Sequence, residues 1–243
     1  MYCRTMDVSY QLADVAACIS HPSRAAMLWS LTAGEARPAS ELAMVANISP
    51  QTASNHLKML IEAGLLRVSR SGRNKFYSLN GEPIATALES LMAVTQQKRA
   101  AGIAERVAPE LVFARTCYDH LAGELAVALL KTLLDKQLLE NCSGGFRATE
   151  KGRAFFEDVG INISMVETAR RRFAYGCLDW SHRIPHLGGA LGAALLNWLL
   201  GTRLLVRSKT PRAVRVTDKG QEALERLFGL RLTRERCSLA ECD

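Results

Sequence analysis

The sequence predicts a mainly α-helical fold with small β-hairpins, an α+β fold, arranged in two domains. Apolar residues recur at helical spacing through most of the chain, and short alternating runs with glycine turns interrupt them. The second half also repeats a pattern of its own. With 243 residues, of which 48% are hydrophobic and 23% charged, the chain can build two cores. We expect the domains to span residues 1–98 and 99–243.

The first domain is expected to begin with two amphipathic helices. Apolar residues between Leu12 and Ile19 recur at helical spacing, and Pro22 breaks this run before a second one in which Met27, Leu28 and Leu31 face inward. We expect both helices to act as a scaffold for the segment that follows them.

A helix with a distinct start signal is predicted from Ser49 onward, after a shorter helix that begins near Ser40. Ser49 can cap the free amides of the first turn, and Pro50 suits the first helical position. The inward stripe consists of Ala53, Leu57, Leu60 and Ile61. The outward residues are Gln51, Thr52, Ser54, Asn55 and Lys58. A helix that enters the major groove of DNA needs short donors and acceptors of this kind near its amino-terminal end.

A basic β-hairpin is predicted directly after this helix. The residues from Leu66 to Leu79 alternate in polarity about a turn at Ser71-Gly72. Between Asn55 and Lys75 there are five bases and one acid, so the local field favours phosphate. A solvated basic loop is the alternative, but the preceding helix favours double-stranded DNA as the partner. The expected DNA-binding residues are Ser49, Gln51, Thr52, Ser54, Asn55, Lys58, Arg70, Arg73 and Lys75.

These motifs carry a family resemblance that covers residues 10–95. They are Glu41-Leu42-Ala43, Ser49 through Leu60, Glu62-Ala63-Gly64-Leu65-Leu66, Gly72-Arg73 and Tyr77-Ser78-Leu79. The segment resembles the arsenic-repressor (ArsR) family of winged-helix regulators. The resemblance implies a winged helix-turn-helix domain and a homodimer on a palindromic DNA operator, acting as a repressor that a signal releases. The dimer is expected to form through the first helix and a long helix from Pro83 to Lys98.

Two metal-site patterns of that family are missing from this sequence. Ala43-Met44-Val45 stands where some members carry a cysteine pair. The helix from Pro83 to Lys98 has no histidine, and Glu89 is its only acid. The resemblance therefore does not imply arsenic or zinc sensing by the first domain.

Charge and cysteine usage predict a cytoplasmic protein without a membrane partner. A net charge of +7 and a pI near 9.2 suit a polyanionic partner. Acids at Asp7 and Asp14 rule against a signal peptide in the first 20 residues, and the apolar stretch at 187–200 is short for a membrane span. Seven scattered cysteines favour reduced thiols over a disulfide framework.

The second domain is predicted to contain two winged-helix-like repeats, at about 112–160 and 177–230. The segment that begins at His120-Leu121 is answered by His186-Leu187, 66 residues later. Each copy has an apolar helix and a strand pair, and Thr149 or Thr217 caps a closing helix. This half resembles the carboxy-terminal extension of longer members of the same family, and that resemblance assigns no ligand.

The repeats carry a set of residues that could sense a signal. They are Cys117, Asp119, His120, Cys177, Asp179, His182 and His186. Thiolate, carboxylate and imidazole groups could bind a transition metal if the two repeats face each other. The sequence favours a plainer interpretation, in which the cysteines are small buried residues while the aspartates and histidines cap or hydrogen-bond locally. No metal is assigned, and no cofactor is required for DNA binding.

Other features of the second half are open to two interpretations. A small-molecule effector could bind between the repeats against the aromatic residues Tyr118, Phe173, Tyr175, Trp180 and Trp198, although such residues more often belong to a core. The basic stretch 203–215 and Arg170-Arg171-Arg172 are expected to be solvated rather than to contact phosphate. Cys3, Cys237 and Cys242 are expected to be spare thiols near the chain ends.

The predicted function is a sequence-specific DNA-binding transcriptional regulator. A constitutive DNA-binding protein with an interaction domain is the first alternative, and a response to an effector would distinguish the two. A thiol-dependent or metal-dependent enzyme is the second alternative. The sequence lacks a glycine-rich phosphate loop, a nucleophile elbow and a His-Glu-x-x-His motif, so we expect no enzyme.

Overall fold

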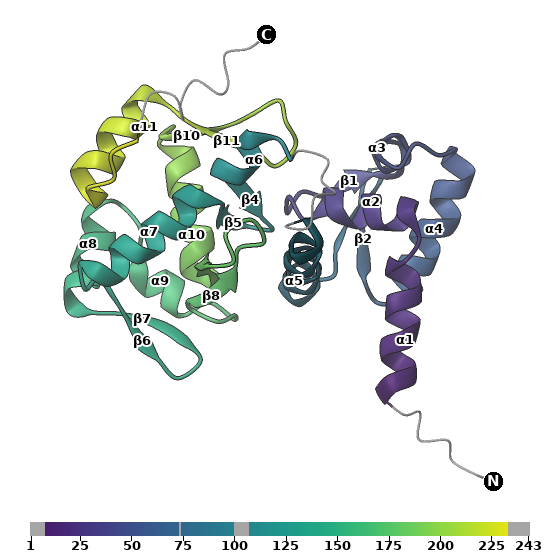
Figure 1. Ribbon diagram of the computed structural model, residues 1–243, viewed down its shortest axis with the longest axis horizontal. Coiled ribbons are helices and arrows are strands. Elements are labelled where there is room, and N and C mark those ends of the chain that lie inside the picture. The colour runs from purple at the N-terminus through teal and green to yellow at the C-terminus, as the bar shows by residue number, and fades with distance from the viewer. Residues whose placement is uncertain (1–7, 73, 100–106, 233–243) are drawn as a thin grey trace. The chain divides into compact units, whose positions relative to one another are not determined.

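A computed structural model of the chain describes residues 8–72, 74–99 and 107–232. The chain forms two compact units, Met1–Leu88 and Glu89–Asp243, which divide within a single helix, α5 (Glu82–Arg99). Figure 1 shows the elements of each unit. Four residues singled out from the sequence, Arg73, Cys3, Cys237 and Cys242, lie outside the described part of the chain.

The first unit combines helices with one three-stranded antiparallel sheet. Its strands are ordered β1-β3-β2. The elements in chain order are α1 (Val8–Ile19), α2 (Pro22–Leu31), β1 (Arg37–Pro38), α3 (Ala39–Val45), α4 (Pro50–Glu62), β2 (Leu66–Ser71), β3 (Asn74–Leu79) and the start of α5. This arrangement confirms the predicted winged helix-turn-helix order.

Local capping explains where the helices of the first unit begin. Pro22 opens α2, and the Nδ1 atom of His21 accepts a hydrogen bond from the backbone amide of Ser23 at 3.2 Å. Ser49 caps α4 through its hydroxyl, which accepts from the amide of Thr52 at 3.2 Å. The core residues are Met27, Leu28, Leu31, Leu42, Ala53, Leu57 and Leu60. The predicted inward stripes of α2 and α4 are thus buried, except for Ile61 at the end of α4, which is half-buried.

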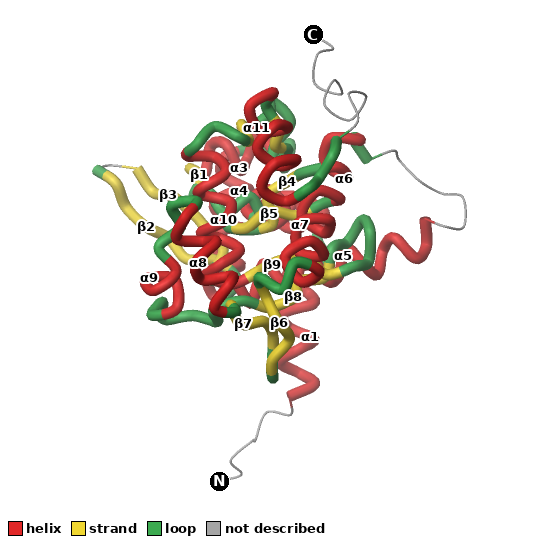
Figure 2. Tube along the Cα trace, turned by 90° about the vertical axis from the view of Figure 1, so that its left-hand side faces the viewer, coloured by secondary structure: helices red, strands yellow, loops and turns green. Residues whose placement is uncertain are grey.

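The β2–β3 hairpin is anchored at its base and exposed toward its tip. Leu66 pairs with Leu79, and both side chains are buried. Further along the hairpin, Val68 on β2 is 45% exposed while its partner Tyr77 on β3 is buried, so β3 packs on the core further toward the tip than β2 does. Gly72 turns the chain with φ +60°, a left-handed value that suits glycine. Figure 2 shows β2 and β3 as a long two-stranded arm.

The second unit is built from two runs of elements that follow the same order. Each run has a hairpin, a long apolar helix, a second hairpin and a closing helix. The first run is α6 (Pro109–Phe113), β4 (Arg115–Cys117), β5 (His120–Ala122), α7 (Glu124–Asp135), β6 (Leu139–Cys142), β7 (Gly145–Ala148), α8 (Glu150–Asp158) and α9 (Ile163–Glu167). The second run is β8 (Tyr175–Leu178), β9 (Pro185–Gly188), α10 (Gly189–Gly201), β10 (Leu205–Arg207), β11 (Val214–Val216), α11 (Asp218–Ala223) and a π-helical turn η1 (Leu224–Phe228). The internal repeat remains a prediction that this shared order favours.

The two runs exchange contacts rather than packing as separate bodies. Helix α10 of the second run packs on β5 of the first, and α7 of the first packs on β9 of the second. Backbone bonds cross in both directions, from the amide of Phe146 to the carbonyl of Ala174 and from the amide of Val214 to the carbonyl of Ala114, each at 3.1 Å. Leucines of α7 and α10 share one hydrophobic core. The second unit is therefore a single body.

The closing helices use the predicted threonine caps. The hydroxyl of Thr149 accepts from the amide of Gly152 at 2.9 Å, and that of Thr217 accepts from the amide of Gly220 at 3.0 Å. At both glycines an added Cβ would overlap a backbone carbonyl oxygen, that of Leu138 or Leu204. Glycine therefore sets how closely each closing helix approaches the preceding strand pair.

Two arginines depart from the expectation that the basic stretches of the second half are solvated. Arg212 is buried; its Nε donates to the carbonyl of Thr116 at 3.1 Å, and its guanidinium pairs with the buried carboxylate of Glu89. Arg171 is half-buried and pairs with Asp119. The expectation was wrong for these residues because their acidic partners lie far away in the sequence.

No described helix is long and apolar enough to cross a bilayer.

The close approach at Gly152 leads to a stability prediction with a matched control. Gly152→Ala should lower the free energy of unfolding by about 1–3 kcal/mol, because its Cβ would displace the Leu138 carbonyl. Gly201→Ala, at an exposed helical position with open space, should raise it by up to about 1 kcal/mol. Urea unfolding of the full chain measures both values. Equal effects at the two glycines would contradict the packing argument.

Candidate functional site

One face of α4 gathers the polar residues that the sequence singled out. Ala53 and Leu57 are buried against the core of the first unit. The exposed residues are Gln51, Thr52, Ser54, Asn55 and Lys58. Because Ser49 caps the helix, the first turn of α4 is fixed and its polar side chains lie on the outside. We call these residues, with Ser49, Arg70 and Lys75, the nucleic-acid face.

Hydrogen bonds within α4 separate the residues of this face into two groups. The hydroxyls of Ser49 and Thr52 lie 2.8 Å apart, and Ser54 donates to the carbonyl of Pro50 at 3.0 Å. In the described part of the chain, Gln51 and Asn55 form no side-chain hydrogen bond. Their amide groups therefore keep all their donors and acceptors for another molecule.

The hairpin adds positive charge next to this helix. Arg70 and Lys75 are direct cross-strand partners, and both are exposed. Arg67, nearer the base, donates from Nε to the hydroxyl of Ser78 at 3.0 Å. Two neighbouring cations without an acid between them suit phosphate oxygens.

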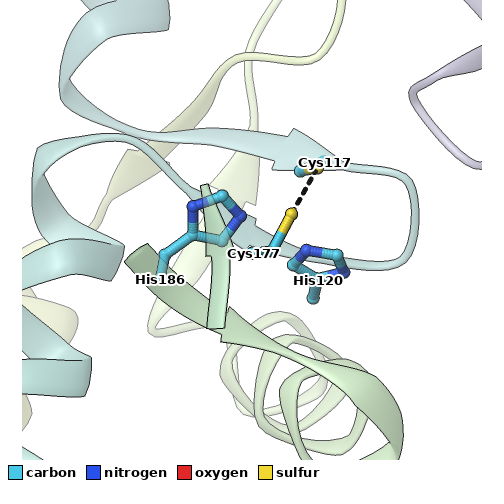
Figure 3. A group of neighbouring side chains, drawn as sticks. All are labelled: Cys117, His120, Cys177 and His186. Carbon is cyan, nitrogen blue, oxygen red and sulfur yellow. Dashed lines mark hydrogen bonds between the residues drawn. The ribbon is translucent and has the colours of Figure 1, made fainter. Parts of the chain in front are cut away.

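A second group of candidate functional residues is buried in the second unit. Cys117 lies directly opposite His120 across β4 and β5, and Cys177 lies opposite His186 across β8 and β9. The two Sγ atoms are 3.9 Å apart, and one ligand atom from each of the four residues lies within 4.8 Å of the others (Figure 3). All four side chains are buried. We call this group the Cys-His cluster.

The three remaining predicted sensor residues surround the cluster without joining it. Asp119 lies 3.3 Å from Nδ1 of His120 and also pairs with the guanidinium of Arg171. Asp179 accepts from the amides of Ser181 and His182, so it orders a turn. His182 packs over that turn and lies outside the four-residue group.

Arg115 is the main residue that sequence reasoning missed. Its side chain is 0% exposed and donates to Asp179 Oδ2 at 2.8 Å, and its guanidinium stacks 4.3 Å from the ring centroid of Trp180. The amide of Gly123 donates to the same Asp179 oxygen at 2.7 Å. Burial alone would raise the pKa of Asp179, but Arg115 and these hydrogen bonds outweigh it and hold the pKa well below its usual range. A lone arginine in a sequence gives no signal of such a role.

Electrostatics differ sharply between the members of the cluster. The hydrogen bond with Cys177 and burial raise the pKa of Cys117 well above its usual value. Burial lowers the pKa of His120, but Cys117 and Asp119 outweigh it and raise the pKa to about 10. Burial and the neighbouring His120 lower the pKa of His186 well below its usual value. At neutral pH the cluster therefore holds a neutral thiol at Cys117 and a neutral imidazole at His186.

Two of the aromatic residues named from the sequence belong to the core, and a third lines a cavity. Tyr175 and Trp180 are buried, and Tyr175 packs with Cys117 and Cys177 in a small core. Trp198 instead lines a cavity of about 430 Å³ between the two runs, with Asp158 and Val159 of the first run and Thr202 and Lys219 of the second. The predicted effector pocket between the repeats does not include Tyr175 and Trp180, because core packing takes up both rings.

Comparison with known proteins places the chain among its relatives. Residues 19–69 match a family model described as a helix-turn-helix domain. The chain is 40% identical over 222 residues to the uncharacterized HTH-type transcriptional regulator YdfF of Bacillus subtilis, covering 91% of this chain and 98% of the relative. A solved winged-helix domain of Mycobacterium bovis Mb0332, titled a possible ArsR-family regulator, is 23% identical with a TM-score of 0.37, covering 44% of this chain and 97% of that one. The cadmium sensor CMTR of Mycobacterium tuberculosis is 28% identical with a TM-score of 0.31, and the match covers 34% of this chain and 85% of that one.

The buried pair at Arg115 leads to a second stability prediction. Arg115→Met should lower the free energy of unfolding by about 3–5 kcal/mol, because it leaves the Asp179 carboxylate buried without its cation. Arg147→Met removes an arginine from an exposed pair with Glu140 and should change it by less than about 1 kcal/mol. Denaturant unfolding followed by tryptophan fluorescence checks both, since Trp180 contacts Arg115. Similar losses in the two variants would contradict the role given to Arg115.

Proposed function

We propose that this chain, which belongs to the family of helix-turn-helix transcriptional regulators, is a homodimeric repressor that a signal sensed in its second unit releases from DNA. Its membership in that family confirms the predicted class, a DNA-binding transcriptional regulator. The proposal for how it reads DNA rests on the exposed polar face of α4 beside a basic hairpin. We place the regulator in the cytoplasm, where operator DNA lies.

In this proposal the first turns of α4 enter the major groove. Gln51 and Asn55 read base edges, because their amides form no hydrogen bond within the part of the chain that the structure describes. Lys58, Arg70 and Lys75 contact phosphates, and we assign Arg73 to the same group from its place in the hairpin sequence. Thr52 and Ser54 add shorter contacts, while Ser49 fixes the helix start.

Exposed apolar side chains support a homodimer. Leu12 on α1 is 70% exposed, and Leu91 and Val94 on α5 are 50% and 60% exposed. Large apolar residues left open along a helix are typical of a surface that a second copy covers. A symmetric dimer would present two α4 helices and so read a palindromic site.

The route for the signal in this proposal is the buried pair between Glu89 and Arg212. Helix α5 begins in the first unit and carries Glu89 in the second. Arg212 joins Glu89 to the carbonyl of Thr116, next to Cys117 of the Cys-His cluster. A change at the cluster that moves β4 would therefore alter the anchoring of α5. Coupling requires that the signal favour one of two such arrangements.

The DNA contacts can be tested by selecting sites from random DNA with the full chain. We expect palindromic sites whose half-sites are about one helical turn apart. Gln51→Ala and Asn55→Ala should reduce discrimination between bases by about 1–3 kcal/mol each. Arg70→Ala and Lys75→Ala should weaken binding to all sequences and lower the salt slope by about 1 each.

Lys131→Ala serves as the control, because it removes an exposed lysine from α7 of the second unit. It should leave both affinity and salt slope unchanged. If the variants at Gln51, Asn55, Arg70 and Lys75 all bind the selected DNA as the parent chain does, the proposal that α4 enters the major groove is wrong. Monomers in sedimentation at DNA-binding concentrations would contradict the dimer.

The signal route can be tested without knowing the signal. Glu89→Gln and Arg212→Gln should each change DNA affinity by about 2- to 30-fold, although neither residue lies on the nucleic-acid face. The change in DNA affinity of the double variant should be smaller than the sum of the two single changes, because each single change already removes the same ion pair. Fluorescence anisotropy with the selected DNA measures these values, with circular dichroism to confirm folding. Unchanged affinity in folded variants would support a constitutive DNA binder instead.

A further inference from the structure

We propose that Cys117, His120, Cys177 and His186 bind one divalent transition-metal ion of the zinc class in a closed, four-coordinate site. Each of the two hairpins supplies one sulfur and one nitrogen. The site lies within the second unit and does not depend on whether the chain is a repressor.

The spacing of the sulfur atoms fits shared coordination. Two thiolates on a tetrahedral zinc ion, with bonds of about 2.3 Å, lie about 3.8 Å apart. The Sγ atoms of Cys117 and Cys177 are 3.9 Å apart, far beyond a disulfide bond of about 2.05 Å. The two imidazole centroids are 5.2 Å apart, and one ligand atom of each ring lies within 4.8 Å of both sulfurs.

Unpartnered nitrogen atoms provide independent support for a ligand. The Nε2 atom of His120 and both ring nitrogens of His186 are buried and form no hydrogen bond in the described part of the chain. A buried polar atom left without a partner destabilises the folded state. A metal ion between the rings would give each imidazole a partner.

The surroundings of the histidines match those of metal ligands. Asp119 lies 3.3 Å from Nδ1 of His120, and Asp179 Oδ2 lies 3.5 Å from Nδ1 of His186. Carboxylates on the Nδ1 side orient an imidazole and leave Nε2 for the metal. The arginines paired with these carboxylates, Arg171 and Arg115, hold them in place.

The ligand types select the metal and set the proton balance. Two sulfurs and two nitrogens in a tetrahedral arrangement favour zinc over magnesium or calcium, which prefer oxygen. On binding, each thiol loses a proton to solvent, as does His120 if it is charged, and the zinc ion balances the two thiolates. With four protein ligands no position is left open, so the ion cross-links the two runs of the second unit.

The test uses the full chain produced without an affinity tag. Elemental analysis should find one zinc ion per chain. After zinc is exchanged for Co²⁺, the absorption spectrum should show visible bands of tetrahedral cobalt together with thiolate charge transfer. Cys117→Ser and His186→Gln should weaken zinc binding by more than about 100-fold.

Two matched controls separate the cluster from other cysteines and histidines. Cys142→Ser changes an exposed cysteine of β6, and His182→Gln changes a histidine beside the cluster but outside it. Both should keep one zinc ion and an unchanged cobalt spectrum. If the ligand variants fail to fold, the cobalt spectrum of the parent chain still shows whether thiolates bind the metal. Only a site with thiolate ligands gives thiolate charge-transfer bands.

Several results would overturn the site. They are a folded parent chain that binds neither Zn²⁺ nor Co²⁺, a cobalt spectrum without thiolate bands, or a mass that shows a Cys117–Cys177 disulfide in place of metal. Loss of metal in Cys142→Ser or His182→Gln would also overturn it. A metal-free chain that still binds its selected DNA would reject the metal site and leave the proposed function intact.

Discussion

A guanidinium removed from water must be matched by a carboxylate that is equally well held, and Asp179 meets this requirement for Arg115. One oxygen of Asp179 receives both the arginine and the amide of Gly123, and it lies 3.5 Å from His186. The other oxygen orders the turn at Ser181. One carboxylate therefore fixes a hairpin of the first run, a hairpin of the second run and an imidazole of the cluster.

The two units satisfy opposite physical demands. In the first, Gln51 and Asn55 are exposed and their amides form no hydrogen bond with other described residues, while Ser49 caps the helix that carries them. In the second, Cys117 and His186 are buried. The hydrogen bond with Cys177 and burial raise the pKa of Cys117, and burial with the nearby His120 lowers the pKa of His186. Helix α5 belongs to both units, and Glu89 is its buried acidic residue in the second.

Local signals in the sequence predicted α4, its cap and the basic hairpin, because each depends on neighbouring residues. The caps at Thr149 and Thr217 were predictable for the same reason. The partners of Arg115 and Arg212 were not, since Asp179 and Glu89 lie far along the chain and no local pattern separates a buried arginine from a solvated one. The predicted sensor set contained the whole Cys-His cluster. It could not separate the four residues of the cluster from neighbours such as Asp119 and His182, because this depends on how the two hairpins face each other.

The exchange of contacts between the two runs has a consequence for synthesis on the ribosome. Strand β5, with His120, is made long before α10, which packs on it. Until then the leucines of α7 lack their partners from α10 in the shared core, and Arg115 lacks Asp179. The first run cannot complete its core as it emerges, so the fold of the second unit depends on elements that are made after it.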